Sequence, residues 1–316
     1  ENILFTSSGT EACNYIISHA IHSYKIENIL YLETEHSAVI DTIYSTNAKR
    51  FKCQMTRDGV INLADLENQL KCLSGKTLVC VMLINNETGV LQPIEDISKI
   101  CRKYEALLFS DMIQALGKID ILQAVSLADF ASFASHKIGG LHGVGLVYMR
   151  DSQPVFKQFY GGEQEFGRKA GTENVIGITA FQIALEACLS KMESEQANNK
   201  KIYKKLFEGV SQISKNIAIP SIAAEKDESI STLIFPGLKS ENIIIALDID
   251  GIAVSAGAAC SSGKIGGSHV LRALKYNENE INSAIRVSFG WHNYPEQVDF
   301  FLKTLNNTLD GMNFNF

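Results

Sequence analysis

The sequence predicts an α/β fold in which a mostly parallel sheet forms a large domain and a smaller C-terminal α/β domain follows. Short apolar runs alternate with helical patterns in the first half of the chain, which is typical of a parallel sheet covered on both faces. The 316 residues are 46% hydrophobic, enough for a sizeable core. A charged helical stretch at 191–205 resembles a connector, so we expect domains at 1–190 and 191–316.

Apolar runs predict six strands in the large domain, at 3–6, 28–33, 77–85, 106–111, 129–134 and 144–149. Helical patterns lie between them at 10–24, 38–46, 63–72 and 94–104, and a further helical stretch covers 172–217. In the small domain we expect strands at 231–235, 252–255 and 284–288, with helices at 240–247, near 269–274 and from residue 295. Asn86, Asp111 and Lys137 each follow a predicted strand, so they are expected to converge at the carboxyl edge of the sheet.

Composition narrows the class of protein. A net charge of -6 argues against a nucleic-acid-binding surface, and we find neither an apolar run of membrane-spanning length nor a signal peptide. The seven cysteines are odd in number, scattered and free of C-x-x-C pairs, which indicates a reducing cytoplasm and no zinc or other metal site. Because Glu1 directly precedes a buried strand, we expect a further segment upstream of this sequence.

The stretch Ser135-His136-Lys137 follows a predicted buried strand and precedes a glycine-rich run. A lysine in this setting suits Schiff-base formation, because desolvation lowers its pKa and exposes a nucleophilic amine. Asp111 ends an earlier apolar strand. Pyridoxal 5'-phosphate most needs a lysine that binds it and an aspartate that pairs with its pyridine nitrogen, so the pair favours this cofactor.

Other polar segments each allow two interpretations. The hydroxyl-rich turn at 6–11 suits a phosphate at a helix N-terminus, or it is an ordinary N-cap. His36 suits stacking on a flat ring and proton transfer, or it caps a helix. The turn at 85–89 and the loop at 168–174 suit ligand and anion binding, or they are simple turns. Gln114 lies close enough to Asp111 in sequence to reach the same ligand.

Cys260 lies in a loop of Gly, Ala and Ser residues, which predicts mobility and exposure, and it is the cysteine that we expect to be a nucleophile. Cys13, Cys80, Cys101 and Cys188 lie on apolar-patterned elements and are expected to be small core residues. Arg286 closes the last strand, where it suits either a bidentate clamp on a substrate carboxylate or a surface ion pair.

Taken together, these segments resemble the cysteine desulfurases of the iron–sulfur and nitrogenase-maturation type, which are class V aminotransferase-like, fold-type I pyridoxal-phosphate enzymes. The matching motifs occur in the family's order and span nearly the whole chain, and the ordered set is specific where single motifs are weak. They are Phe5-Thr-Ser-Ser-Gly-Thr-Glu11, Glu35-His36, Asn85-Asn-Glu-Thr-Gly89, Asp111-x-x-Gln114, His136-Lys137, Arg168-x-x-Gly-Thr172, Ala259-Cys-Ser261 and Arg286-x-Ser-x-Gly290.

The resemblance implies a role for each candidate residue in a homodimer that converts L-cysteine to L-alanine. Lys137 carries the cofactor and acts as base, Asp111 keeps the pyridine nitrogen protonated, and Cys260 takes the sulfur as a persulfide for an acceptor or iron–sulfur scaffold protein. It further implies that Gln114, Asn86 and His36 contact the cofactor ring, and that His36 also moves protons. The phosphate contacts would come from Gly9, Thr10, Ser135, His136 and, from the other subunit, Thr172. Arg286, with Asn86, would bind the substrate carboxylate.

The chain departs from the family's pattern in several places. Ala134 stands where the family has a serine that contacts the phosphate, and the hydroxyl has moved to Ser135. Ser8 stands where glycine is common, Leu141-His142 replaces Pro-Lys, and the family's N-terminal segment, which packs against the small domain, is not in this sequence.

Three alternatives stay open. A selenocysteine lyase or an aminotransferase shares the expected fold, although a cysteine on a small-residue loop argues against an aminotransferase. A catalytically weak homologue that acts as a scaffold partner is the third. Retention of Lys137, Asp111, Cys260 and Arg286 together argues against that last possibility.

Overall fold

The computed structural model describes residues 2–151, 156–257, 267–312 and 314. The chain divides into two compact units. The first unit comprises Glu1–Thr56, Val60–Ile84 and Gln92–Met192, and the second comprises Arg57–Gly59, Asn85–Leu91 and Glu193–Phe316.

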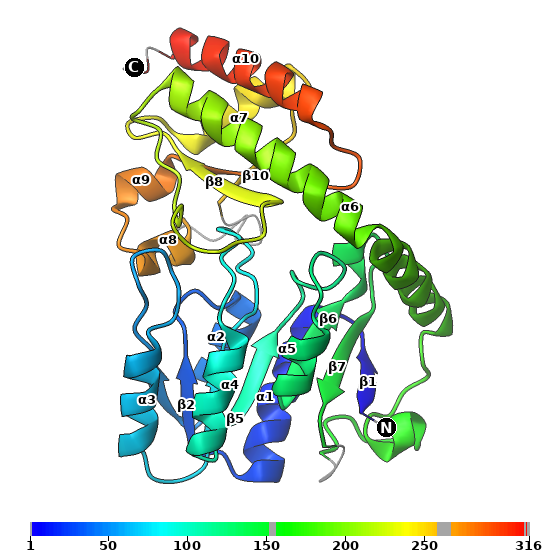
Figure 1. The fold of residues 1–316 in the computed structure, drawn as a ribbon. Coiled ribbons are helices and arrows are strands. Elements are labelled where there is room, and N and C mark those ends of the chain that lie inside the picture. Colours follow the sequence, from blue (N-terminus) through cyan, green and yellow to red (C-terminus); the bar gives the residue numbers. More distant parts are fainter. Residues whose placement is uncertain (1, 152–155, 258–266, 313, 315–316) are drawn as a thin grey trace. The chain divides into compact units, whose positions relative to one another are not determined.

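A seven-stranded sheet forms the centre of the first unit (Figure 1). Its strands are β1 (Ile3–Thr6), β2 (Asn28–Tyr31), β3 (Lys49–Lys52), β4 (Thr77–Cys80), β5 (Leu107–Asp111), β6 (Phe130–Ala134) and β7 (Gly145–Met149), in the spatial order β1-β7-β6-β5-β4-β2-β3. Strands β2 to β6 pair in parallel, whereas β7 is antiparallel to both of its neighbours. The carboxyl ends of β1, β4, β5 and β6 therefore lie at one edge, together with the first residue of β7.

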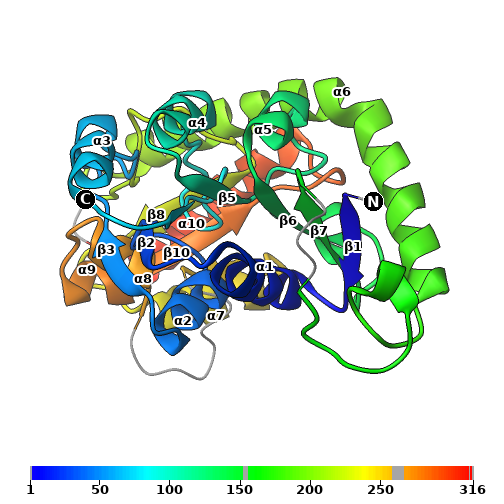
Figure 2. The ribbon, with the colours of Figure 1, turned by 90° about the horizontal axis from the view of Figure 1, so that it is seen from below.

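Helices cover both faces of this sheet, which confirms the predicted architecture (Figure 2). One face carries α1 (Gly9–Tyr24) and α2 (Ser37–Ser45), and the other carries α3 (Leu63–Cys72), α4 (Ile94–Lys103) and α5 (Leu122–Leu127). Two short 3-10 helices, η1 (Ser135–Ile138) and η2 (Gln164–Gly167), follow, and α6 (Val175–Ile213) comes after them.

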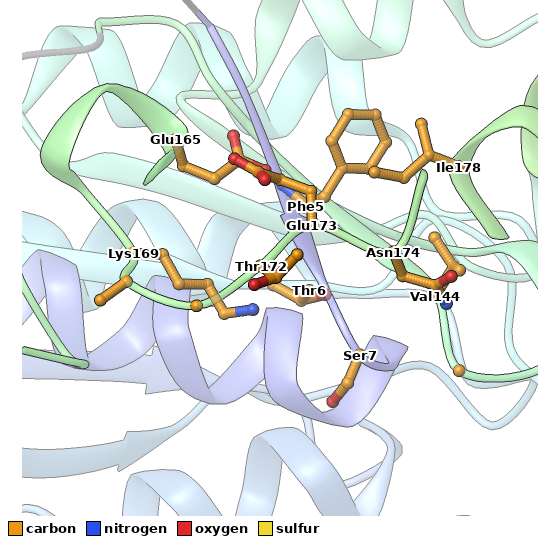
Figure 3. Close-up of a pocket in the computed structure, with 13 residues that line it drawn as sticks. Phe5, Thr6, Ser7, Val144, Glu165, Lys169, Thr172, Glu173, Asn174 and Ile178 are labelled. Carbon is orange, nitrogen blue, oxygen red and sulfur yellow. The ribbon is translucent and has the colours of Figure 1, made fainter. Parts of the chain in front are cut away.

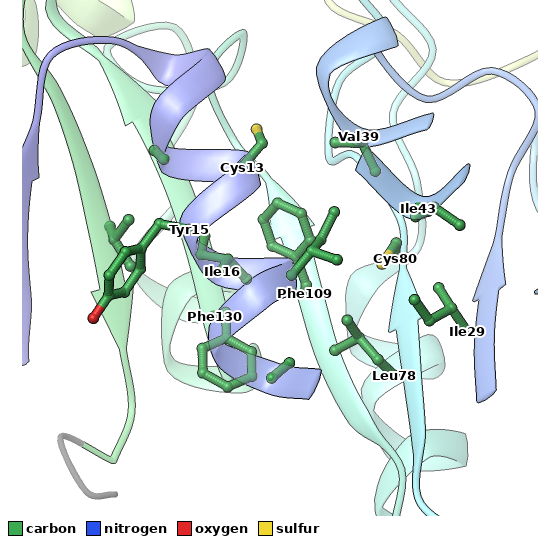
Figure 4. Packing of buried hydrophobic residues seen from close by; sticks show 14 of the residues in the cluster. Cys13, Tyr15, Ile16, Ile29, Val39, Ile43, Leu78, Cys80, Phe109 and Phe130 are labelled. Atoms are coloured by element: carbon green, nitrogen blue, oxygen red, sulfur yellow. The ribbon is translucent and has the colours of Figure 1, made fainter. Parts of the chain in front are cut away.

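The main core of the first unit lies between α1, α2 and the sheet (Figure 4). Cys13 and Ile16 of α1 meet Phe109 of β5 and Cys80 of β4, and all four are fully buried. Burial of each large apolar side chain contributes about 1.5–3 kcal/mol, so this cluster holds the sheet edge and the start of α1 together.

The second unit contains a three-stranded antiparallel sheet in the order β8 (Ile230–Ile234), β10 (Ala284–Ser288), β9 (Ser255–Ala256), with helices α7 (Ser240–Ile249), α8 (His269–Ala273), α9 (Glu278–Asn282) and α10 (Pro295–Gly311). Leu233 pairs with Ile285 and both lie in a core shared with α7 and α10. Ile234 pairs with Ala284 and both lie in a second core shared with α8. Neighbouring residues thus face opposite sides of the sheet, as the two-residue period of a strand requires.

The length and apolar composition of α6 differ from the expectation that the chain has no segment of membrane-spanning length. Among the described residues, α6 is one helix that is long and apolar enough to cross a membrane, whereas no apolar run of that length was expected from the sequence. A single helix of this kind is weak evidence for a membrane span. Its exposed apolar side chains, Val175, Ile176, Ile183 and Leu189, also suit contact with another protein surface.

Candidate active site

Asp111 is the buried acid at the carboxyl end of β5. Its Oδ1 accepts hydrogen bonds from the Ile113 backbone N–H at 3.0 Å and from the Ser132 hydroxyl at 3.1 Å. Burial raises the pKa of Asp111, whereas these hydrogen bonds and the charge of His36 lower it. A carboxylate at this depth is stabilised by a cation placed beside it, which is the condition that a protonated pyridine nitrogen satisfies.

The turn between β1 and α1 brings a helix N-terminus to the same edge of the sheet. The Ser8 hydroxyl caps α1 by accepting from the Glu11 N–H at 3.1 Å, so the N-cap interpretation is confirmed. A Cβ on Gly9 would overlap Ile113 Cδ1 and lie 3.2 Å from Ala134 Cβ. A Cβ on Gly145, the first residue of β7, would overlap the Ser8 backbone. Only glycine permits this close approach, and it leaves backbone N–H groups at the helix start for an anion.

Lys137 lies in η1, directly after β6, and its side chain is exposed. The expectation that burial desolvates this amine is therefore wrong for the single chain, because Lys137 lies in an exposed turn after the buried strand. His136 beside it stacks on His142, with 5.6 Å between the ring centroids. Partial desolvation, then the charges of Lys137 and His142, lower the pKa of His136.

Ser135 is fully buried, unlike His136 and Lys137, which follow it. Its Oγ has no hydrogen-bond partner among the described residues, and a Cβ on Gly140 would overlap it. The hydroxyl thus points toward Gly140, which follows the η1 turn. Ala134, not Ser135, occupies the position that faces Gly9 at the start of α1. The phosphate contact expected of Ser135 stays a prediction, and the orientation of its hydroxyl does not favour it.

His36 and Glu35 follow β2. The His36 Nδ1 accepts from the Ala38 N–H at 3.0 Å and caps α2, so the capping interpretation is confirmed, and the ring proton then lies on Nε2. The Glu35 carboxyl is fully buried and its Oε1 accepts from the Met82 N–H at 2.7 Å. Burial raises the pKa of Glu35 well above its ordinary value.

Thr10 and Gln114 are less buried than Asp111 at this edge of the sheet. Thr10 is exposed in the first turn of α1. The Gln114 side chain is half-buried, and its Oε1 accepts from the Lys118 amine at 3.2 Å.

Asn86 and Arg286 belong to the second unit, where the structure brings them together. Arg286 Nη1 donates to the Asn86 carbonyl at 3.0 Å. Asn86 Oδ1 and Arg286 Nε are buried and have no hydrogen-bond partner among the described residues, which leaves polar atoms for a ligand. The predicted strand at 77–85 ends at Cys80, so Asn86 does not directly follow a strand as expected.

Glu87, which the sequence analysis did not single out, anchors this turn. Its carboxylate accepts from the Ser268 hydroxyl at the start of α8, and its carbonyl accepts from the Thr232 hydroxyl at 2.8 Å. A Cβ on Gly257 would lie 3.6 Å from the same carboxylate. An acidic residue inside an Asn-rich turn after an apolar strand is the signal that could have identified it.

Thr172 is exposed and lines a cavity of about 150 Å³ in the first unit with Ser7 and Lys169 (Figure 3). The Lys169 amine pairs with the Glu11 carboxylate at 3.3 Å, which ties this loop to the start of α1. Arg168 is buried and donates to the carbonyls of Ile3 and Glu165, so its guanidinium binds backbone groups of β1 and η2.

Cys260 lies outside the described residues. The other six cysteines are free thiols, of which Cys13, Cys53, Cys80 and Cys101 are buried. Within the described part of the chain, no group of three or more His, Cys, Asp or Glu side chains could hold a metal ion.

The residues at this edge fit pyridoxal 5'-phosphate. The buried Asp111 carboxylate suits a cationic ring nitrogen, the tight glycine turn at the start of α1 suits the phosphate, and Lys137 supplies the amine. These groups lie at or just after the carboxyl ends of β1, β5 and β6; β5 and β6 are adjacent in the sheet, and β7 lies between β6 and β1.

Comparisons with known proteins agree with this chemistry. Residues 1–301 match the model of the aminotransferase class-V family. The chain is 32% identical to the cysteine desulfurase IscS of Pasteurella multocida over 97% of this chain and 76% of that protein, and 34% identical to the putative cysteine desulfurase IscS 1 of Bacillus subtilis over 94% and 80%. Among solved structures, a NifS-like protein superposes with a TM-score of 0.88 at 30% identity, covering 98% of this chain and 83% of that one.

Proposed function

The chain belongs to the aminotransferase class-V family and, within it, to the cysteine desulfurases, and on that premise we propose how its residues carry out the reaction. The enzyme depends on pyridoxal 5'-phosphate and converts L-cysteine to L-alanine. When bound, the cofactor supplies an electron sink for the pair released as the α-proton leaves.

The first unit holds the cofactor and moves protons. The start of α1 at Gly9 and Thr10, with His136, would hold the phosphate, Asp111 would keep the ring nitrogen protonated by pairing with it, and Lys137 would carry the covalent link. Once substrate displaces it, the freed Lys137 amine takes the substrate α-proton. His36, whose neutral ring would carry its proton on Nε2, would lie against the ring face and donate that proton, and Gln114 would contact the ring oxygen.

The second unit handles the substrate. Arg286 binds the cysteine carboxylate through its unsatisfied guanidinium N–H, with the Asn86 amide beside it. The Cys260 thiolate then attacks the substrate sulfur. An S–S bond forms as the carbon–sulfur bond breaks, the electron pair stays on carbon, and protonation of that carbon gives alanine, leaving a persulfide on Cys260.

The enzyme acts as a homodimer with shared sites, and a second copy covers the exposed apolar residues of α6. In support, Val175 and Ile176 are exposed at the start of α6, within four residues of Thr172, so contact between copies along this helix would bring Thr172 close to the partner subunit. The persulfide passes to a sulfur acceptor or iron–sulfur scaffold protein. Bacterial relatives and six free thiols support a cytoplasmic setting.

One observation carries the assignment of the site: a buried carboxylate, a glycine-only helix start and a lysine turn share one edge of one sheet. Borohydride reduction of the holoenzyme followed by peptide mapping should label Lys137. The label should disappear in Lys137→Ala and persist in Lys118→Ala, a lysine of the same unit whose amine donates to Gln114. A label on another lysine contradicts the assignment.

A second experiment tests the nucleophile and the substrate. After one turnover with L-cysteine, persulfide should map to Cys260. Cys260→Ala should still bind cysteine and change the absorbance of the cofactor but release no sulfide, because Lys137 and Arg286 remain. The same assay with L-selenocysteine separates a desulfurase from a selenocysteine lyase, which would turn over the selenium substrate far faster.

A further inference from the structure

Asp111 is held by a small buried network that its catalytic role does not by itself explain. Ser132 lies directly opposite Asp111 in the β5–β6 register and is fully buried. Its hydroxyl donates to Asp111 Oδ1, and the Ile113 N–H donates to the same oxygen. Oδ1 therefore has two strong donors.

The other carboxylate oxygen has a different environment. Cys13, on the buried face of α1, places its Sγ 3.8 Å from Asp111 Oδ2 and 3.4 Å from Ser132 Oγ. A thiol is a weak donor, and burial raises the pKa of Cys13 well above its ordinary value, so it remains a thiol. Oδ2 is thus left as the stronger acceptor for a ligand.

We propose that Ser132, with Cys13 behind it, is a positioning residue that fixes the orientation of the Asp111 carboxylate and sets how strongly it holds the proton of the cofactor ring nitrogen. This inference rests on the proposed function of Asp111. Ser132 and Ile113 fix Oδ1, and the weak Cys13 contact leaves Oδ2 directed to the ring.

The charges around Asp111 agree with this role. Burial raises the pKa of Asp111, whereas the hydrogen bond from the Ile113 N–H, the charge of His36, the hydrogen bond from Ser132 and, least, that from Cys13 lower it. Ser132 is thus the side-chain donor with the largest influence on this carboxylate. Its removal should make the carboxylate a stronger base, which draws the proton from the ring nitrogen.

The test uses the holoenzyme loaded with cofactor labelled with ¹⁵N in the ring. In Ser132→Ala we expect the ring-nitrogen signal to move toward that of unprotonated pyridine and the cofactor dissociation constant to rise on the order of tenfold. Cys13→Ala should shift the signal in the same direction but less, because a thiol is the weaker donor. Ser132→Thr, which keeps the hydroxyl, should restore the wild-type signal.

Ser110 provides the matched control. It precedes Asp111 on β5, is equally buried, faces the opposite side of the strand, and its hydroxyl has no partner among the described residues. Ser110→Ala should leave the ring-nitrogen signal unchanged. An unchanged signal in Ser132→Ala, or an equal shift in Ser110→Ala, overturns the proposal.

A measurement on the apoprotein separates this inference from the proposed function. With ¹³C-labelled aspartate, and the Asp111 signal assigned by its loss in Asp111→Asn, Ser132→Ala should raise the pKa of Asp111 without any cofactor. A raised pKa with no cofactor binding in any variant would reject the cofactor site but keep the network. Unchanged titration with normal binding would reject the network alone.

Discussion

His19 should make the apoprotein lose stability in acid. The residue lies in α1 and is 1% exposed, among the rings of Tyr15, Tyr24 and Phe130 at centroid distances of 5.6–5.9 Å. Its Nε2 has no hydrogen-bond partner among the described residues. Burial, and then the charge of Arg168, lower the pKa of His19 from 6.5 to about 4.

The sign and size follow from proton linkage. Above pH 6.5 the ring is neutral in both states, so it adds no pH dependence. Below that pH the unfolded chain takes up a proton that the folded chain refuses until about pH 4, so stability is lost as the pH falls through this window. The fall in the pKa of His19 from 6.5 to about 4 corresponds to about 3 kcal/mol of unfolding free energy.

Urea unfolding of the apoprotein, followed by far-ultraviolet circular dichroism between pH 7 and 4, measures this loss. His19→Phe keeps an aromatic ring in the cluster, so its free energy of unfolding should fall by about 3 kcal/mol less than that of the wild type over the window. His22→Phe, an exposed histidine one turn further along α1, should follow the wild type. Parallel curves for wild type and His19→Phe would refute the reasoning.

Three further outcomes are expected. Ala134→Ser buries a hydroxyl and should lower the stability of the apoprotein by about 1–2 kcal/mol, measured by thermal unfolding. Because that hydroxyl faces Gly9, the variant should also bind the cofactor about tenfold more tightly in a fluorescence titration. An unchanged cofactor affinity would contradict this second expectation. Arg286→Lys should raise KM for L-cysteine about tenfold more than it changes kcat, because lysine cannot bind the carboxylate bidentately; equal effects on both would argue against substrate binding. Ser268→Ala removes a donor from the buried Glu87 carboxylate and should cost about 2 kcal/mol in urea unfolding, and a loss below 0.5 kcal/mol, roughly the size of a surface substitution, would show that this contact is unimportant.

Strong apolar patterns made most of the fold predictable. The runs at 3–6, 63–72 and 284–288 have the predicted bounds, because each is flanked by residues that end an element. β3 escaped prediction because its sequence, Lys-Arg-Phe-Lys, is an exposed edge strand without apolar alternation. The run from residue 77 looked like one long strand because it stays apolar to Ile84, yet its sheet pairing with β2 ends at Cys80.

The site was only partly predictable for a related reason. Residues next to strand ends, such as Asp111 and Lys137, can be identified because the chain direction alone places them at the edge. The partners of Asp111 cannot, since the contact with Ser132 depends on strand register and the contact with Cys13 on how α1 packs over the sheet. Local sequence assigned Cys13 to the core, and nothing in it indicated a polar neighbour.

The antiparallel pairing of β1 with β7 also fixes when the site can form. β1 pairs in this sheet only with β7, the last of its seven strands in chain order, where Ile3 lies opposite Tyr148, and Gly145 of β7 lies against the backbone of Ser8. Contacts between such distant residues form slowly, because a long chain must close before they are made. During synthesis, β1 and the Ser8–Gly9 turn can therefore take their folded positions only after β7 has left the ribosome. We expect the growing chain to bind its cofactor only after that point.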